Sequence, residues 1–189
     1  PCIHATDGTV LKFIGDAIFA IWNAPEPQAD HAARALRAAL HMRDRLEKLV
    51  ASNQQSAFAT RIGVHMGNAY VGNCGSRERF EYTAIGNDVN IASRLEGLNK
   101  YFGTSIIASV DLLARTNDEF VVRPLGDIRP KGSDRVIGVA EILAARVDLP
   151  VMPDWVGPFV DGIREFQKSN WDAAVECFHR TLALNPGDQ

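Results

Sequence analysis

The chain has 189 residues, of which 46% are hydrophobic and 23% charged, and its formal net charge at pH 7 is −3. This length can bury the core of one full domain and carry a small appendage. The slightly acidic balance, without a long basic run, argues against a nucleic-acid partner, and no apolar stretch approaches the roughly 20 residues that cross a bilayer.

The first predicted element is a β-hairpin. Residues 9–14 and 17–22 are short runs rich in β-branched and aromatic residues, broken at Gly15-Asp16, which is the pattern of two strands joined by a tight turn. This turn would expose the Asp16 side chain. From Asp30, a suitable helix cap, alanine and leucine recur at helical spacing with basic residues between them, so a long amphipathic helix is predicted next.

The middle of the chain is predicted to mix strands and helices. Residues 58–65 and 69–74 flank Gly67-Asn68, which predicts a second hairpin. The elements predicted after it are a helix over 87–98, a strand at 105–108, a short helix at 111–115, and two strands at 120–125 and 136–143 around Pro130-Lys131-Gly132. Hairpins mixed with packed helices indicate an α+β domain with a largely antiparallel sheet flanked by helices.

The composition changes near Asp148. We interpret residues 1–147 as the main domain, 148–154 as a linker and 155–189 as a C-terminal helical hairpin. The hairpin has the spacing of one tetratricopeptide repeat, carried by Gly162, Phe166, Trp171, Ala174, Phe178 and Pro186. Because one such repeat cannot bury its own apolar face, it has to dock on the main domain, bind a protein partner, or continue in further repeats.

The chain begins at Pro1 and enters a strand pattern within a few residues, so we expect it to be a piece of a longer protein. Its cysteines, Cys2, Cys74 and Cys177, are odd in number and widely spaced. That spacing argues against a disulfide framework and against a zinc site. It favours a reducing, cytoplasmic location.

Two segments carry the chemistry. They are Lys12 to Asp16, with the sequence KFIGD, and Glu81 to Arg94, with the sequence EYTAIGNDVNIASR. Together they resemble the catalytic domain of the class III nucleotidyl cyclases, the adenylate and guanylate cyclases. The resemblance runs from about Gly8 to about Ile142. It implies a ferredoxin-like cyclase fold that acts on a nucleoside triphosphate.

The resemblance assigns a metal ligand. Asp16 matches one of the family's two aspartates that bind a pair of Mg²⁺ or Mn²⁺ ions, which prefer carboxylate oxygen. Without its motif, Asp16 would be an ordinary turn aspartate. The family's other aspartate lies on a strand farther upstream, followed by two helices, and nothing between Pro1 and Asp16 replaces it. We therefore expect this chain alone to have little or no activity.

Lys12 and Thr83 match the positions that read the base. Adenine presents an acceptor at N1 and a donor at N6, so a lysine donor and a threonine hydroxyl acceptor suit it, whereas guanine calls for an acidic acceptor at the first position. The pair favours ATP. Adenylate cyclases often carry Asp at the second position, and a Thr variant occurs among bacterial members. Taken without the motif, both residues would be unremarked strand residues.

Asn90 and Arg94 are four residues apart and so share one face of the predicted helix. The resemblance implies that Asn90 orients the ribose and that Arg94 stabilises charge on the α-phosphate in the transition state, a task that suits guanidinium. Arg61 and Lys131 match positions that contact the β- and γ-phosphates. Each would otherwise be a basic or polar surface residue. His65 lies inside a predicted strand, and we interpret it as a packed histidine rather than a general base.

In this family the active sites lie between two head-to-tail chains, so the metal aspartates and the base-, ribose- and phosphate-binding set of one chain serve different sites. A chain that carries both kinds of residue implies a homodimer with two equivalent sites. The sequence thus predicts a bacterial-type adenylate cyclase that makes cyclic AMP and pyrophosphate from ATP. Two alternatives stay open: a non-catalytic cyclase-like module that binds a nucleotide or a partner for regulation, and a protein-interaction module built on the tetratricopeptide-like hairpin.

Overall fold

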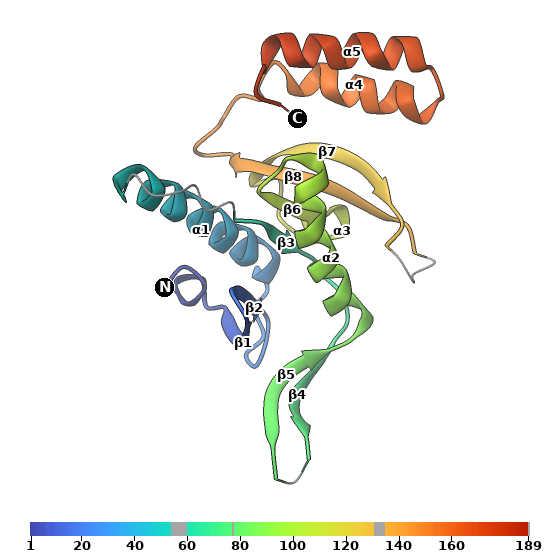
Figure 1. Ribbon diagram of the computed structural model, residues 1–189. Helices are drawn as coiled ribbons and strands as arrows, with labels where there is room; N and C mark the ends of the chain where they lie inside the picture. Colours follow the sequence, from blue (N-terminus) through green and yellow to red (C-terminus); the bar gives the residue numbers. More distant parts are fainter. Residues whose placement is uncertain (54–59, 77, 131–134, 189) are drawn as a thin grey trace.

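The computed structural model describes residues 1–53, 60–76, 78–130 and 135–188, and its centre is a four-stranded sheet with the strand order β3-β6-β8-β7 (Figure 1). β3 (Ile62–Val64) pairs in parallel with β6 (Ile106–Ser109). β8 (Ile137–Ala145) is antiparallel to both β6 and β7 (Phe120–Ile128). This mixed, mostly antiparallel sheet confirms the predicted α+β class.

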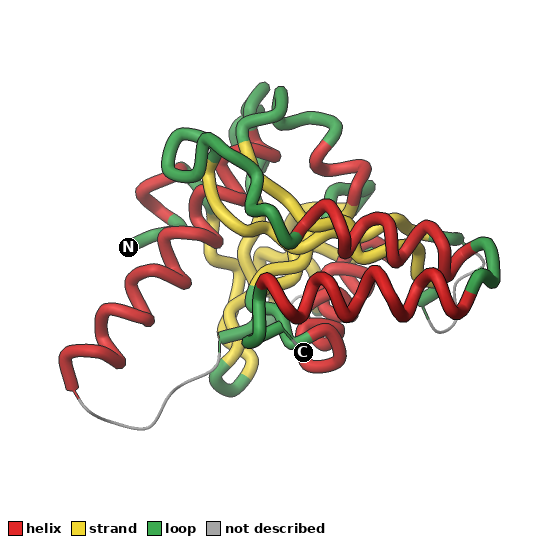
Figure 2. The backbone as a smooth tube through the Cα atoms, turned by 90° about the horizontal axis from the view of Figure 1, so that it is seen from above, coloured by secondary structure: helices red, strands yellow, loops and turns green. Residues whose placement is uncertain are grey.

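Helices cover both faces of the sheet (Figure 2). Successive side chains of a strand point to opposite faces, so neighbouring residues of one strand contact different helices. Ile106 and Ala108 of β6 belong to a buried cluster formed with α1 (His31–Asn53). Ile107 between them belongs to a cluster formed with α2 (Asn87–Phe102). In the described part of the chain, no helix is long and apolar enough to cross a membrane. Two short helical elements, η1 (His4–Thr6) and α3 (Val110–Leu113), lie beside α1 and β8.

Two separate hairpins extend from this body (Figure 1). β1 (Thr9–Ile14) and β2 (Ala17–Ile21) form the first, as predicted, and its turn contains Gly15 at a φ of +62°, which glycine adopts readily. β4 (Tyr70–Gly75) and β5 (Phe80–Ile85) form the second, which projects as an arm.

The predicted hairpin between residues 58–65 and 69–74, whose residues 58 and 59 lie outside the described residues, is wrong. β3 pairs with β6, and β4 pairs with β5, a strand that the sequence interpretation did not contain. The reason is that Gly67-Asn68 does not form a turn between strands but lies against the start of α2. A Cβ on Gly67 would lie 2.2 Å from Cγ of Asp88, and the Asn68 amide donates to that carboxylate at 2.7 Å.

The C-terminal segment is the predicted helical hairpin, with α4 (Val156–Gln167) and α5 (Trp171–Leu184) side by side (Figure 1). Gly162 of α4 is required by close packing, since a Cβ there would lie 2.6 Å from the Phe178 ring of α5. Trp171, one of the repeat positions, is 56% exposed and meets the Phe166 ring in a T-shaped contact with centroids 5.2 Å apart. Of the three ways to cover the hairpin, docking on the main domain is observed, through α4 and β7.

Arg123 of β7 joins this hairpin to the sheet. The residue is 3% exposed, and its guanidinium donates to Glu141 of β8 at 2.8 Å and to Asp188, beyond α5, at 2.5 Å. The rings of Trp155 and Phe159 flank it, with centroids 5.1 and 4.6 Å away. Burial raises the pKa of Glu141, and Arg123 opposes that rise. A buried cation is costly unless it is paired, and the two carboxylates provide that pairing for Arg123.

Candidate active site

The β1–β2 hairpin places two predicted site residues. Lys12 is half-buried on β1, opposite Phe19, and Asp16 is exposed in the turn. Among the described residues, Asp16 makes no hydrogen bond or ion pair. Its neighbours are apolar and open to solvent, with Phe13 70% and Ile14 60% exposed. The turn therefore presents a free carboxylate at the edge of an apolar surface.

β5 and α2 carry three more predicted site residues. Thr83 is 6% exposed on β5, and β5 lies against β1, so the strands of Lys12 and Thr83 are neighbours. The chain then turns at Gly86 into α2, where Asn90 is exposed and Arg94 is half-buried. The strand-to-helix junction thus carries the predicted base, ribose and α-phosphate contacts on one continuous segment.

Two buried side-chain atoms of the described residues have no hydrogen-bond partner, Oγ1 of Thr83 and Nη1 of Arg94. Leaving a buried polar group unpaired costs about 1–3 kcal/mol, so such groups are rare and concentrate at sites that bind something. Both belong to residues that sequence resemblance assigned to the substrate. Their lack of partners is a property of the fold that the sequence does not display.

α2 is held against β3 with no side chain between the two backbones. A Cβ on Gly63 would lie 2.2 Å from the Glu96 nitrogen and 2.3 Å from the Ala92 oxygen. Toward the end of the helix, Nδ2 of the buried Asn99 donates to the Ile62 oxygen at 3.1 Å. Asn90 and Arg94 therefore project from a helix whose depth and register are fixed by the sheet.

The two predicted contacts to the β- and γ-phosphates have different outcomes. Arg61, exposed just before β3, donates from Nε to Glu96 of α2 at 2.9 Å. A phosphate would have to replace Glu96 as its partner. Lys131 lies outside the described residues.

The donor set for a metal is incomplete in the described part of one chain. No group of three or more His, Cys, Asp or Glu residues there could hold a metal ion. Asp16 supplies a single exposed carboxylate, so the described residues by themselves do not fit a metal pair. Class III cyclase domains generally use divalent metals, and Asp16 is the one predicted ligand that this chain displays.

His65 is buried as predicted, with 1% of its side chain exposed. Burial lowers its pKa, and Asp88 acts in the opposite direction. Its ring lies 2.8 Å from the Ser109 hydroxyl and 3.3 Å from Asp88. Sequence reasoning assigned no role to Asp88. The available signal was an acidic residue in the first turn of α2, two positions before Asn90.

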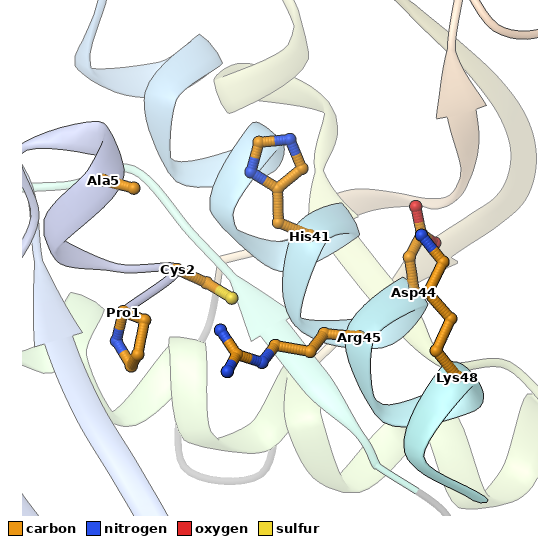
Figure 3. Close-up of a pocket in the computed structure, with 7 residues that line it drawn as sticks. All are labelled: Pro1, Cys2, Ala5, His41, Asp44, Arg45 and Lys48. Carbon is orange, nitrogen blue, oxygen red and sulfur yellow. The ribbon is translucent and has the colours of Figure 1, made fainter. Parts of the chain in front are cut away.

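The cavities of the chain lie elsewhere. One, of about 360 Å³, is open beside α1, where the Arg45 side chain extends toward Pro1 and Cys2 (Figure 3). Another, of about 530 Å³, is lined by Asp88 and Arg135 among others. Neither cavity is lined by a predicted site residue that the structure describes. Lys12, Asp16 and Thr83 lie on the two hairpins instead, and Asn90 and Arg94 lie on α2.

The fold is that of a nucleotidyl cyclase domain. The family model "Adenylate and Guanylate cyclase catalytic domain" matches residues 2–140, and the chain belongs to this family. Adenylate cyclase 1 of Rhizobium meliloti (strain 1021) is 44% identical over 144 residues, which are 75% of this chain and 22% of that protein. The chain thus spans about a fifth of the length of this curated relative.

Solved structures agree with the family. The guanylyl cyclase Cya2 superposes with a TM-score of 0.68 and 28% identity, over 76% of this chain and 74% of that one. The adenylyl cyclase CyaB from P. aeruginosa superposes with a TM-score of 0.63 and 27% identity, over 78% of this chain and 77% of that one. Both nucleotide classes therefore occur among the structural neighbours.

Proposed function

We propose that residues 1–147 are the catalytic part of an adenylate cyclase that converts ATP to cyclic AMP and pyrophosphate for cyclic-nucleotide signalling. The enzyme works as a homodimer with two equivalent sites and binds two Mg²⁺ or Mn²⁺ ions. It acts in the cytoplasm, in keeping with three free cysteines. The observation that supports this proposal most is the pair of buried atoms without partners, on Thr83 and Arg94.

The base contacts favour adenine. The Thr83 hydroxyl oxygen has no donor within the described residues and can accept from the N6 amino group. Lys12 can donate to N1. Guanine has a donor at N1, which would meet the Lys12 ammonium, another donor. GTP would therefore leave this N1–H and the ammonium poorly paired with each other. Adenylate cyclase rather than guanylate cyclase is therefore our first choice.

The reaction is an attack of the ribose 3′-oxygen on the α-phosphorus. The bond between the 3′-oxygen and the α-phosphorus forms, the bond from the α-phosphorus to pyrophosphate breaks, and the 3′-hydroxyl proton passes to solvent water. Asn90 orients the ribose, and Arg94 stabilises the negative charge that develops on the α-phosphate, where a preorganised donor is worth most. Arg61 and Lys131 hold the β- and γ-phosphates. Divalent metals would supply charge neutralisation and a more acidic 3′-hydroxyl, with Asp16 as one ligand and further ligands from outside the described residues.

The exposed hairpins support pairing with a second copy. Tyr70 and Phe80 of the arm are 85% and 63% exposed, and Phe13 beside Asp16 is 70% exposed. Apolar side chains in this number are uncommon on the surface of a monomer and mark an interface. Because the hairpins that carry Asp16 and Thr83 also carry this apolar surface, a second copy would meet the chain at its site residues.

A second candidate function is suggested by the C-terminal hairpin. Its outer surface exposes Phe166, Trp171 and Leu184 by about half. A protein partner or a further repeat would cover this surface. This function would add to the cyclase activity and would not replace it, since the hairpin docks on β7 and leaves the β1–β2 turn exposed.

The test is nucleotide turnover with Mn²⁺ by the 189-residue chain and by a version extended by the upstream strand and two helices of the family. In the extended protein we expect ATP to be used far better than GTP. Lys12→Glu combined with Thr83→Cys should lower ATP turnover sharply and raise GTP turnover relative to it, since each lost pairing costs about 1–3 kcal/mol. The exposed Lys100→Glu is the matched charge control. Unchanged nucleotide preference in the double variant would refute the base assignment.

A further inference from the structure

We propose that Asp88 is a positioning residue that fixes the start of α2, and with it Asn90 and Arg94, against the segment between β3 and β4. This inference rests on the proposed function of Asn90 and Arg94. Asp88 lies in the first turn of α2, with 18% of its side chain exposed. It does not face the substrate in this proposal, because both of its oxygens are engaged by the protein.

The carboxylate closes a chain of hydrogen bonds that begins at the sheet. Its Oδ2 accepts from the Asn68 amide at 2.7 Å, and its Oδ1 lies 3.3 Å from Nε2 of His65. Because burial lowers the pKa of His65, the ring is neutral and carries one N–H. Asp88 can only accept, so Nε2 holds that hydrogen and Nδ1 accepts from the Ser109 hydroxyl at 2.8 Å.

The serine, histidine and aspartate of this chain do not form a hydrolytic site. Ser109 is 0% exposed, so its hydroxyl cannot reach a substrate, and the ring accepts its hydrogen at Nδ1. The three residues instead connect the end of β6, the segment after β3 and the start of α2. A buried network with every member paired rigidifies the elements that it joins.

Local backbone geometry explains why this position needs a carboxylate. The residue before α2, Gly86, offers no side chain to cap the helix, and a negative charge in the first turn is favoured by the helix dipole. The facing segment approaches within backbone contact. A Cβ on Gly86 would lie 2.9 Å from the Asn68 oxygen, and one on Gly67 would lie 2.3 Å from Oδ2 of Asp88. Gly67 and Gly86 allow the segment between β3 and β4 to approach the start of α2, and Asp88 then accepts a hydrogen bond from Asn68 of that segment.

Asp111, which shares the cationic partner Arg135 with Asp88, provides a control for charge. Nη1 of Arg135 lies 3.6 Å from Oδ1 of Asp88, and its Nη2 donates to Asp111 of α3 at 2.7 Å. Asp111 thus shares a cationic partner with Asp88, but among the described residues no side-chain hydrogen bond or ion pair is found between Asp111 and α2. Removing Asp111 tests the contribution of the charges around Arg135, whereas removing Asp88 also removes the contacts with Asn68 and His65 that attach α2.

The first experiment measures steady-state cyclase kinetics in the extended protein. We expect Asp88→Ala to lower kcat for ATP by about 10- to 100-fold with KM changed less than about threefold, because a small misplacement of Arg94 affects the transition state most. Asp88→Asn keeps an acceptor for the Asn68 amide and should lose about three- to tenfold. Asp111→Ala should change kcat less than about twofold. Equal losses in Asp88→Ala and Asp111→Ala would overturn the proposal.

The second experiment separates positioning from a general loss of stability. In an Arg94→Ala background, Asp88→Ala should lower kcat by less than about tenfold further, because the part of its effect that acts through Arg94 is already lost and only the part through Asn90 remains. Losses that multiply would refute the role. Hydrogen exchange in Asp88→Asn and Asp88→Ala should accelerate in residues 86–94 and stay unchanged in β7 and β8. Unchanged exchange in residues 86–94 would refute the attachment of α2 by Asp88. Absence of cyclase activity in the wild-type extended protein would refute the proposed function, and the exchange experiment does not depend on that activity.

Discussion

The four-stranded sheet and the two projecting hairpins solve the burial of apolar side chains in opposite ways. In the sheet, Ile106 and Ile107 are both 0% exposed because α1 and α2 cover the two faces. In the hairpins, Tyr70 and Phe80 remain more than half exposed, and an isolated two-stranded hairpin is marginally stable in water. Within the described residues, both faces of the sheet are covered by helices of the same chain, whereas the hairpins leave apolar side chains exposed. The proposed substrate contacts lie where these two regions join.

The comparison predicts its largest effect for the shared site. Asp16→Ala and Arg94→Ala should each lower the activity of the extended protein by about 10²–10³, the usual loss for one preorganised transition-state donor or a metal ligand. Mixing the two inactive proteins should recover about a quarter of wild-type activity. By binomial mixing about half of the dimers are mixed, and each has one site with both wild-type residues.

Recovery requires the subunits to exchange, which differential labelling verifies. If labelled subunits have exchanged and the mixture stays as inactive as its parents, Asp16 and Arg94 act within one chain. The hairpins would then need another explanation for their exposed apolar side chains.

The next prediction compares a substitution in the four-stranded sheet with one in the β4–β5 arm. Gly63→Ala forces a Cβ to within 2.2 Å of the α2 backbone and should lower the free energy of unfolding by about 3 kcal/mol. Phe80→Ser on the exposed arm should change it by less than about 0.5 kcal/mol while weakening dimerisation. Urea unfolding measures the first quantity, and sedimentation of the same proteins measures the second. A stable Gly63→Ala protein, or a Phe80→Ser protein that dimerises normally, would remove the distinction.

A smaller effect concerns the pH dependence of the sheet region. The pKa of His65 is lowered by burial from its ordinary value of 6.5, so below about pH 6.5 the unfolded chain binds a proton that the folded chain does not. The contribution of His65 is complete above that pH and is lost as the pH falls toward its folded pKa, with a slope of at most about 1.4 kcal/mol per pH unit.

Urea unfolding between about pH 5 and pH 7.5 measures this slope. His65→Asn should flatten it, and the exposed His179→Asn is the control. An unchanged slope in His65→Asn would show that His65 does not set it.

The smallest predicted effect concerns the ion pair between α2 and the residue before β3. Glu96→Gln releases Arg61 from an exposed ion pair, in which the two side chains are 45% and 43% exposed. Stability should change by less than about 1 kcal/mol. The KM for ATP should fall by about two- to threefold, because Arg61 would no longer have to leave the Glu96 carboxylate before it binds a phosphate. Glu47→Gln on α1 is the control, and a rise in KM in Glu96→Gln would contradict the assigned role of Arg61.

Local patterns predicted the elements whose signals are local. The β1–β2 hairpin followed from Gly15-Asp16 between apolar runs, and α2 followed from helical spacing after Gly86. The β4–β5 arm was not predicted, because Gly67-Asn68 has the composition of a turn. Its real partner, Asp88, is distant in sequence. A strand pairing that depends on such a contact cannot be read from periodicity.

The candidate site shows the same division. Lys12, Thr83 and Arg94 were singled out because their motifs resemble those of the cyclase family. The unpaired state of Thr83 and Arg94 depends on what surrounds each atom in space, and the pairing of Arg61 with Glu96 depends on the approach of α2 to β3. Burial and partner choice are tertiary properties, so only the structure supplies them.

Arg123 has a consequence for how this chain can change over evolutionary time. Its buried guanidinium pairs with Glu141 in the main domain and with Asp188 near the end of the C-terminal hairpin. A neutral substitution of Arg123 leaves these two largely buried carboxylates without their cation, and neutral substitutions of Glu141 and Asp188 remove that cost. Across relatives that keep the hairpin, the three positions should therefore vary together, and the hairpin and the main domain should be inherited as one unit.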